Sequence, residues 1–441
     1  MERKKFKSSP VTRLAKISKS LLVAGGHIAA GKIKNKIDFI QEKKEEFTDT
    51  AHKIKAAKEI IQQMGNLKGA LMKLGQMISI TEDLIISPEI SALFRELQKK
   101  SPPMRDKDLD TVFRESFSKK PEEIFKSFNR TPIASASIGQ VHEATLQDGT
   151  KVAVKVQYPK IVKAIKSDFK NIDQIKKLLL LIFPNLPNVD NYLHELKDNL
   201  FLECDYNYEA DNINWFRDHL RPLVEGIYIP QVFSDYSSST ILTMEFVEGD
   251  SYEETKHYSQ ESRNYLGQVL YNFHMTTLYQ LNKMHTDPQN GNYLFQPDKI
   301  ILLDFGSIKK FPPDFIDLYI KLIQSIENKD LDSYKELIKA VGFLTEQDDE
   351  PHIEKHFELV SQLYLPYTKK GVFCIDPQNP FQMIDTFAKT ISLKGRSTPR
   401  QEFLLLDRAN LGLYTKLKYW KSEIDWVSKK EEVWKNFYLS S

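Results

Sequence analysis

The sequence predicts an α+β fold with two lobes, a small β-rich lobe followed by a larger helical one. Two β-rich runs in residues 131–158 are separated by Asp148-Gly149, a typical hairpin turn, and a further strand-like run covers Ile241–Gly249. Helical apolar spacing dominates residues 160–220 and returns after the third run. Strands gathered in one part and helices in another are typical of an α+β protein.

The composition is that of an ordinary globular protein and excludes several classes of function. The chain has 441 residues, of which 41% are hydrophobic and 28% charged, enough for a large core. Its 62 Lys and Arg against 60 Asp and Glu give a net charge of +2, which argues against a general nucleic-acid binder. Two cysteines, Cys204 and Cys374, exclude a disulfide scaffold and a cysteine-rich zinc site. With no apolar run of about 18 residues, we expect no membrane-spanning helix.

The N-terminal part of the chain is a basic arm. The first 36 residues contain ten Lys or Arg side chains and a single acid, Glu2. Three interpretations stay open: a solvated basic segment, a helix lying on an anionic membrane surface, and an organelle transit peptide. The basic residues are mostly Lys rather than Arg, which weakens the last interpretation.

The order of these patterns divides the chain into four parts. Apolar residues recur at intervals of three and four between Ala51 and Leu97, which predicts helices that end before Pro102. The expected parts are a basic arm over residues 1–50, a helical extension over 51–130, a β-rich lobe over 131–247 and a helical lobe over 248–441. In the last lobe we expect a helix up to Met284, a short hairpin over residues 292–306, and helices from there to the end.

The first motif with chemical content lies on the predicted β-rich hairpin. Residues 134–141 read ASASIGQV, which matches the spacing of the kinase loop G-x-G-x-x-G-x-V with alanine in place of the first two glycines. Fourteen residues after Val141, the second strand carries VAVK, ending at Lys155. A kinase needs this order, because the loop covers the phosphates of ATP and the lysine contacts the α- and β-phosphates. The joint match therefore predicts a phosphate-binding lysine, where a lone lysine would be read as solvated.

A second motif matches a kinase catalytic loop. His285, Asp287 and Asn292 fit the pattern H-x-D-x-x-x-x-N, in which Asp accepts the proton of the substrate and Asn holds a metal ion. Asp304-Phe-Gly follows seventeen residues after Asp287, directly behind the apolar run KIILL. Mg²⁺ prefers one or two carboxylates together with phosphate oxygens and water, which Asn292 and Asp304 could supply beside ATP.

A carboxylate partner for the lysine is expected from the segment ECDYNYEADN at residues 203–212. Asp205 and Glu209 are four residues apart, so they would share one helix face. Two acids on one face are usually solvated, but the segment is flanked by apolar and aromatic residues. We therefore expect partial burial, and buried acids need cationic partners.

Together these motifs resemble those of the UbiB/ADCK (AarF) family, protein-kinase-like ATPases tied to ubiquinone and other isoprenoid lipid metabolism. The chain is similar to this family in five motifs in order: K-x-G-Q at Lys73–Gln76, SASIGQVH, VAVK, E-x-D-Y-x-x-E-A-x-N, and D-P-x-x-x-N with DFG. The resemblance covers roughly residues 50–310 and, more loosely, Leu404–Tyr414. It implies a bilobal protein-kinase-like fold with an N-terminal helical extension, and ATP and Mg²⁺ as cofactors.

The resemblance also implies catalytic roles. Lys155 would pair with Glu209, Asp287 would be the catalytic-loop acid, and Asn292 and Asp304 would bind the metal. The residues implied to bind the nucleotide, including the hinge strand, are Ala134, Ser135, Ala136, Ser137, Gly139, Val141, Ala153, Lys155, Met244, Glu245 and Val247.

A regulatory role is implied for the helical extension. Lys73 and Gln76 would lie across the active site near Glu203 and Asp205. In the family, this extension occupies the space where a protein substrate would bind.

Three departures bear on the substrate. Gln289 and Asn290 replace the His and Pro that many members of the family carry in the catalytic loop. Thr286 stands where typical protein kinases have Arg, and no A-P-E segment follows DFG. The changes at Gln289 and Asn290 leave the metal-binding positions in place and bear on the fine tuning of the loop. Thr286 and the missing A-P-E segment disfavour a long peptide-binding platform and hence an ordinary protein kinase.

We therefore expect an enzyme that binds Mg-ATP and hydrolyses it, supporting ubiquinone or related isoprenoid lipid biosynthesis or transport at a membrane surface. The alternatives are a small-molecule phosphotransferase and a catalytically weak pseudokinase acting as a lipid-binding scaffold. The expected partners are nucleotide and an anionic membrane lipid or an isoprenoid or quinone precursor, with no nucleic acid and with a homo-oligomer left open. The expected location is the cytoplasm, peripheral to the inner membrane, with the matrix side of the mitochondrion as the alternative.

Overall fold

The computed structural model describes residues 104–440, except for 137, 170–171, 174–175, 178–179, 181–188, 345–347, 369 and 375–399. All the described residues belong to one compact unit of the chain. The predicted basic arm and the predicted site residues Lys73, Gln76 and Ser137 lie outside the described residues.

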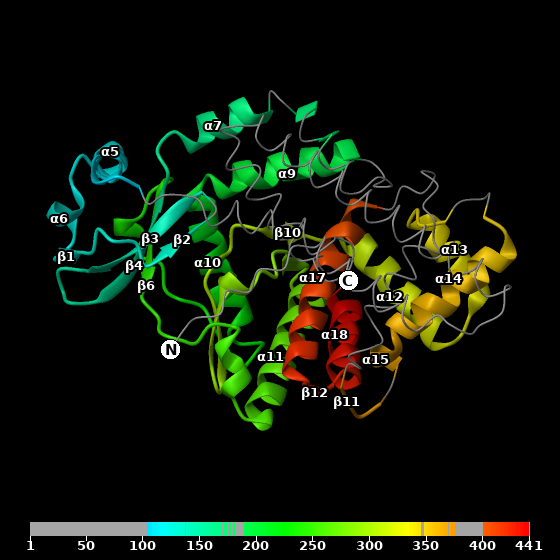
Figure 1. Ribbon diagram of the computed structural model, residues 1–441. Coiled ribbons are helices and arrows are strands. Elements are labelled where there is room, and N and C mark those ends of the chain that lie inside the picture. Colours follow the sequence, from blue (N-terminus) through cyan, green and yellow to red (C-terminus); the bar gives the residue numbers. More distant parts are fainter. Residues whose placement is uncertain are drawn as a thin grey trace, which may run out of the picture. The chain divides into compact units, whose positions relative to one another are not determined.

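The β-rich lobe is built on a five-stranded antiparallel sheet (Figure 1). Its strands are β1 Ser127–Phe128, β2 Ala134–Ser135, β3 Gly139–Thr145, β4 Lys151–Gln157 and β6 Ile241–Glu245. They lie in the order β1-β3-β4-β6, with β2 paired to β3. The hairpin between β3 and β4 turns at Gly149, whose φ of +94° suits glycine. The hairpin predicted at Asp148-Gly149 is confirmed, and β4 is a central strand.

The core of this lobe fixes which face of the sheet can hold a site. Two helices precede the sheet, α5 Asp106–Phe117 and α6 Pro121–Ile124. Three valines alternate along β4: Val152, Val154 and Val156. They are fully buried and form a core with residues of α5. Because side chains alternate across a strand, Ala153 and Lys155 lie on the opposite face of the sheet.

Three described helices connect β4 to β6: α7 Ile161–Asp168, α9 Val189–Glu203 and α10 Tyr206–Leu220. Asp205 is the N-cap of α10, and its side chain accepts a hydrogen bond from the backbone N–H of Asn207 at 3.1 Å. The prediction that Asp205 and Glu209 share a helix face is therefore wrong. The cap places the Asp205 carboxylate at the start of the helix, exposed, while Glu209 in the first turn is 2% exposed.

The helical lobe begins with α11 and a group of short strands. These elements are α11 Gln260–Tyr279, β7 Lys283–His285, β8 Tyr293–Gln296, β9 Lys299–Leu302 and β10 Ile308–Lys310. β8 and β9 form the predicted hairpin, β5 (Ile227–Tyr228) pairs with β9 in parallel, and β10 pairs with β7. The helix predicted to reach Met284 ends earlier, because Met284 pairs with Lys309 in the β7–β10 ladder.

The remaining elements complete the helical lobe. They are α12 Pro313–Glu327, α13 Leu331–Ala340, α14 Glu350–Leu363, α15 Leu365–Thr368, β11 Val372–Cys374, α17 Gln401–Trp420, β12 Glu423–Asp425 and α18 Val427–Ser440. The β11–β12 pair interrupts the run of helices expected here, because its ladder joins two segments far apart in the sequence. Among the residues that the structure describes, the 3₁₀ helices are η2 Ser234–Tyr236, η3 Glu254–His257 and η4 Asn290–Asn292. In Figure 1, α17 (orange-red) and α18 (red) lie beside α11 (green), and α11 contacts both of them.

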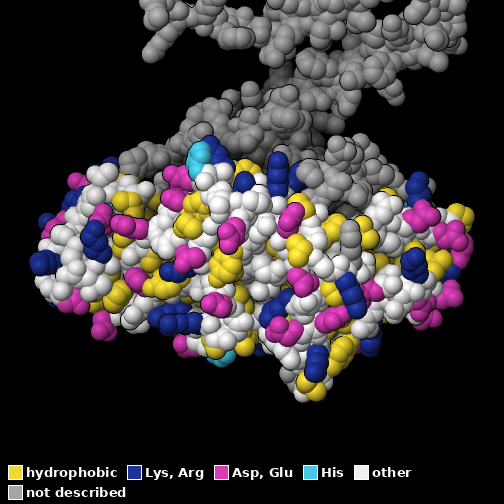
Figure 2. All heavy atoms as spheres, turned by 90° about the horizontal axis from the view of Figure 1, so that it is seen from below, with side chains coloured by type: hydrophobic (Ala, Val, Ile, Leu, Met, Phe, Trp, Pro, Cys, Tyr) yellow, Lys and Arg dark blue, Asp and Glu magenta, His cyan; other side chains and the backbone are white. Residues whose placement is uncertain are grey.

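The α+β, two-lobed, kinase-like fold predicted from the sequence is confirmed. The predicted division at residues 50, 130 and 247 stays a prediction, although the sheet already begins at β1, before residue 131. On the face shown in Figure 2, acidic and basic side chains are interspersed among the described residues, in keeping with the balanced charge. Within the described ranges, no helix has the length and apolar character needed to cross a bilayer.

Candidate active site

Lys155 is the centre of the candidate site. Its Nζ donates to both carboxylate oxygens of Glu209 at 2.8 Å and to Oδ2 of Asp304 at 2.9 Å. The three side chains come from β4, α10 and the segment after β9. The side chain of Glu209 is 2% exposed, that of Lys155 is 12% and that of Asp304 is 30%. Asp304 is therefore the member of this ion cluster that is most open to solvent.

The cluster contains two carboxylates and one ammonium group, and this imbalance shows in their pKa values. Burial opposes the charge on Lys155, but Asp304 and Glu209 outweigh it and hold the pKa of Lys155 well above its usual value. Burial raises the pKa of Glu209 to about 7, against the attraction of Lys155. The pKa of Asp304 is lowered, because Lys155 and His285 overcome its burial. Asp304 is thus the firmly ionised carboxylate of the pair.

Close packing of α10 on the sheet brings Glu209 to the lysine. A Cβ on Gly139 would lie 2.9 Å from the hydroxyl of Tyr206 and even closer to the carbonyl of Val156, so only glycine allows this approach. Nζ of Lys155 lies 5.1 Å from the centroid of the Tyr206 ring. Gly139, predicted to bind nucleotide, therefore also has a packing role.

The backbone around Asp304 is held by buried hydrogen bonds. Nε2 of His285 donates to the carbonyl of Asp304 at 2.7 Å, and the amide of Asn212 donates to the carbonyl of Phe305 at 3.2 Å. Oδ1 of Asp304 accepts the backbone N–H of Gly306 at 3.0 Å. With the backbone held in this way, the Asp304 carboxylate is directed at Lys155.

The predicted catalytic loop lies next to this cluster. Asp287 is 4% exposed, and its backbone N–H donates to Nδ1 of His285 at 3.1 Å. The side-chain amide nitrogen of Asn292 donates to the carbonyl of Asp287 at 3.1 Å. Because the amide nitrogen is used in this way, the amide oxygen of Asn292 is the atom that the side chain could offer to a metal ion.

Asn292 and Asp304 therefore fit a magnesium ion that is completed by phosphate oxygens and water. Within the described ranges, no three His, Cys, Asp or Glu side chains are grouped so as to hold a metal by themselves. Mg²⁺ that is bound together with a nucleotide needs only one or two protein ligands, because phosphate and water oxygens supply the rest.

The residues predicted to bind nucleotide fall into two sets. In the first set, Val141 pairs with Lys155 and Met244 pairs with Ala153, so these four side chains lie on the Lys155 face of the sheet. In the second set, Ala134 and Ser135 form the exposed edge strand β2, and the N–H of Ala136 donates to the carbonyl of Gly139 at 2.9 Å.

Two hinge residues differ from that arrangement. Glu245 directs its carboxylate to the hydroxyl of Tyr228, at 2.6 and 2.7 Å from its two oxygens. Val247 lies just beyond β6 and is half-buried.

The two predicted regulatory acids are placed differently. Glu203, the last residue of α9, is 9% exposed, and its Cγ lies 3.4 Å from where a Cβ on Gly306 would stand. Glu203 therefore reaches the DFG glycine, whereas Asp205 caps α10. Their predicted partners Lys73 and Gln76 are outside the described residues.

Comparison with known proteins decides the family. The model of the ABC1 atypical kinase-like domain matches residues 96–338, more than half of the chain. The chain belongs to the ABC1 atypical kinase-like family. The resemblance to the UbiB/ADCK (AarF) kinases is thereby confirmed.

Curated relatives of this ABC1 family member agree with the assignment. The chain is 29% identical over 401 residues to the probable serine/threonine-protein kinase abkA of Dictyostelium discoideum, covering 86% of the chain and 70% of abkA. It is 30% identical over 321 residues to the mitochondrial atypical kinase COQ8B of Rattus norvegicus, covering 72% of the chain and 60% of COQ8B.

A solved structure shows the same fold. Rv3197 from Mycobacterium tuberculosis, determined in complex with erythromycin, superposes with a TM-score of 0.59 at 26% identity. The match covers 89% of this chain and 99% of Rv3197.

Residues of α17 reach the site of this ABC1 protein, and the motif analysis missed them. Arg408 donates from Nη2 to Oδ1 of Asp287 at 3.0 Å, and Nζ of Lys416 donates to the carbonyl of Pro288. Burial lowers the pKa of Lys416 to about 7, although Asp287 opposes this shift. Both residues lie beyond residue 338, where the family match ends. The sequence did contain a pattern that could have indicated them. Arg408, Gly412 and Lys416 are spaced by four, within Leu404–Tyr414 and just after it.

Proposed function

We propose that this protein binds Mg-ATP and hydrolyses it slowly, in support of ubiquinone or related isoprenoid lipid metabolism at a membrane surface. The observation that carries the proposal is the cluster in which Lys155 contacts Glu209 and Asp304, beside a loop that holds Asp287 and Asn292. These are five ionic or metal-binding positions of a phosphoryl-transfer site. A scaffold without chemistry would need none of them.

Each residue has a distinct task in this proposal. Lys155 binds the α- and β-phosphates, and Glu209 holds the lysine in place from α10. Asn292 and Asp304 bind Mg²⁺, which neutralises charge that develops on the transferred phosphoryl group. Asp287 orients the attacking water or hydroxyl and accepts its proton.

The acceptor in this proposal is water or a small molecule rather than a protein. Only six residues separate Gly306 from Pro313, the first residue of α12, and three of them form β10 on β7. Thr286, at the position of the kinase arginine, is fully buried and bonds Ser307, the residue directly before β10. The chain therefore has no long segment here that could bind a peptide or respond to its own phosphorylation.

The lipid role and the location rest on the relatives. The COQ8 relatives from Danio rerio, Rattus norvegicus and Caenorhabditis elegans are named as mitochondrial atypical kinases. They support the quinone pathway and favour the mitochondrial alternative for location. Membrane contact would be peripheral, with the basic arm as its candidate.

The test is Mg²⁺-dependent ATP turnover by wild type, Asp304→Asn and Asp298→Asn, with phosphatidylcholine liposomes containing or lacking an anionic phospholipid. Asp298 is an exposed aspartate between β8 and β9 and serves as the matched control. We expect Asp304→Asn to lose turnover at least about 100-fold, Asp298→Asn to keep it, and anionic liposomes to raise it. Retained turnover in Asp304→Asn would contradict the site.

A second candidate function is phosphoryl transfer to a small molecule, which the short segment after Gly306 also favours. It predicts a phosphorylated product formed one for one with ADP, whereas hydrolysis yields free phosphate. Tight nucleotide binding without turnover under any condition would instead indicate a lipid-binding scaffold.

A further inference from the structure

One face of α17 lies directly on the catalytic loop. Arg408, Gly412 and Lys416 are spaced by four, so they lie in one row along the helix. All three contact the dipeptide Asp287-Pro288.

The first contact is a buried ion pair. The side chains of Arg408 and Asp287 are 11% and 6% exposed, and Nη2 lies 3.0 Å from Oδ1. Residues 285–292 contain no Lys or Arg, so the loop has no positive side chain of its own. A carboxylate this deeply buried needs a cationic partner, and α17 supplies one.

The other two contacts hold the loop backbone. A Cβ on Gly412 would lie well inside contact distance of the Pro288 ring, so the helix backbone itself packs against the proline. Lys416 is 3% exposed, donates to the Pro288 carbonyl, and lies 4.9 Å from the centroid of the Tyr293 ring. Arg408 therefore holds the side chain of Asp287, and Lys416 holds the carbonyl of the following residue, Pro288.

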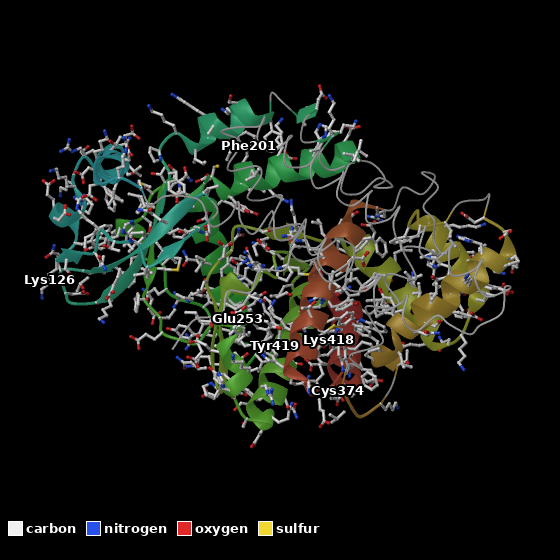
Figure 3. The ribbon with its side chains drawn as sticks, viewed as in Figure 1. Lys126, Phe201, Glu253, Cys374, Lys418 and Tyr419 are labelled. Carbon is white, nitrogen blue, oxygen red and sulfur yellow. The ribbon has the colours of Figure 1, made fainter. Side chains whose placement is uncertain are left out.

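The helix that makes these contacts is itself firmly held. His274 of α11 bonds Asn410 at 2.8 Å, and the indole of the fully buried Trp420 donates to Thr255 at 2.8 Å. Near the end of α17, the Tyr419 hydroxyl donates to the carbonyl of Glu253 at 3.3 Å, and Figure 3 shows the two residues side by side. A rigid element of this kind can set the orientation of a functional side chain.

We propose that Arg408 is a positioning residue, which holds the Asp287 carboxylate in the orientation that phosphoryl transfer requires. This inference rests on the proposed function of the site. It extends the active site to α17, which lies beyond the matched ABC1 domain. Because a misplacement of about 1 Å can cost about 100-fold in rate, losing the ion pair should act on turnover rather than on nucleotide binding.

The experiment compares wild type, Arg408→Gln, Arg408→Lys and the control Arg400→Gln in the full chain. Arg400 also pairs with carboxylates, Asp314 and Glu402, at the start of the same helix, away from Asp287. The measurements are kcat and KM for Mg-ATP, together with hydrogen exchange of the backbone over residues 285–293.

We expect Arg408→Gln to lower kcat by about 10- to 100-fold with KM within about threefold, and Arg408→Lys to recover part of the loss. Exchange over residues 285–293 should rise in Arg408→Gln and stay unchanged in Arg400→Gln. An unchanged kcat, or a loss that appears only in KM, would overturn the proposal.

The two proposals fail in different ways. Absence of turnover in wild type would contradict the proposed function alone, and the exchange experiment would then decide whether Arg408 holds the loop. Unchanged exchange in Arg408→Gln would overturn the positioning role whatever the activity.

Discussion

The two sides of the site are held by different kinds of ion pair. On the side of the sheet, Lys155 is shared by two carboxylates, Glu209 and Asp304. On the side of the catalytic loop, Asp287 meets Arg408 from α17. The first cluster lies wholly inside the matched ABC1 domain, whereas the second draws a residue from outside it. Residues that the kinase motifs identify can thus depend on residues that lie outside those motifs and outside the matched domain.

The two ion clusters also suit different tasks, one the binding of a ligand and the other the orientation of a catalytic side chain. Lys155 is surrounded by excess negative charge, which a nucleotide-bound Mg²⁺ would reduce, so this side of the site is arranged for ligand binding. The charges of Arg408 and Asp287 balance each other. The neighbouring contacts of Gly412 and Lys416 are with the ring and the carbonyl of Pro288. That side is arranged to keep one geometry. Changes on the two sides should therefore have different consequences.

The largest effect is expected from Lys155→Met. It removes the side chain that we propose binds the phosphates, and it leaves the carboxylates of Glu209 and Asp304 without their ammonium partner. We expect ATP turnover to fall at least about 100-fold and the free energy of unfolding to fall by about 3–5 kcal/mol. Turnover assays and urea denaturation measure the two losses.

Lys151→Met is the matched control, because Lys151 lies on the same strand with its side chain 63% exposed. It should leave both quantities nearly unchanged. If Lys155→Met retained full turnover, the distinction between a binding side and an orienting side would be lost.

A smaller effect is expected from Gly412→Ala, which pushes α17 and the catalytic loop apart. Alanine favours the helix by up to about 1 kcal/mol, but its Cβ would overlap the Pro288 ring. Overpacking of this kind costs about 1–3 kcal/mol, so the variant should be slightly destabilised. Turnover should fall about tenfold with little change in nucleotide affinity, measured by kinetics and by nucleotide titration.

Thr415→Ala is a suitable comparison on the same helix, because its hydroxyl only bonds the carbonyl of Leu411 in its own helix. It should keep wild-type turnover. A Gly412→Ala protein that turns over ATP normally would show that close contact with Pro288 is not needed for catalysis.

The smallest effect concerns acid stability of the contact between α11 and α17. Burial lowers the pKa of His274 to about 4, below its value of about 6.5 in an unfolded chain. The unfolded chain therefore binds this proton first, and the stability that depends on a neutral His274 is lost as the pH falls from about 6.5 towards 4. At pH 5 the loss from this residue should be about 2 kcal/mol.

Urea denaturation at pH 7 and pH 5 tests this, with His274→Gln compared with wild type. The glutamine variant should lose about 2 kcal/mol less than wild type between the two pH values, because it has no proton to bind. An equal loss in both proteins would mean that His274 does not govern this contact.

Much of the site was predictable because its residues lie in short segments with regular spacing. Lys155, Asp287, Asn292 and Asp304 were located by motif. In the structure Asp304 contacts Lys155, and His285 links the loop of Asp287 and Asn292 to the backbone of Asp304. The helix boundary near Met284 and the role of Asp205 were missed for local reasons. Met284 pairs with Lys309 in a strand ladder, so the helix ends before it. The Asp205 carboxylate caps α10, because the first N–H groups of a helix lack partners within it.

The sequence by itself determined the two-lobed fold, the family and the residues expected to bind ATP and metal. These follow from periodicity and from spacing within short segments, where the geometry of the chain sets which residues lie close together. Only the tertiary structure decided that Asp205 caps α10 while Glu209 is buried, and that α17 reaches Asp287. Contacts between residues more than 100 positions apart, such as Asp287 and Arg408, depend on how whole helices pack. That packing is set by the summed burial of many side chains and leaves no local pattern in the sequence.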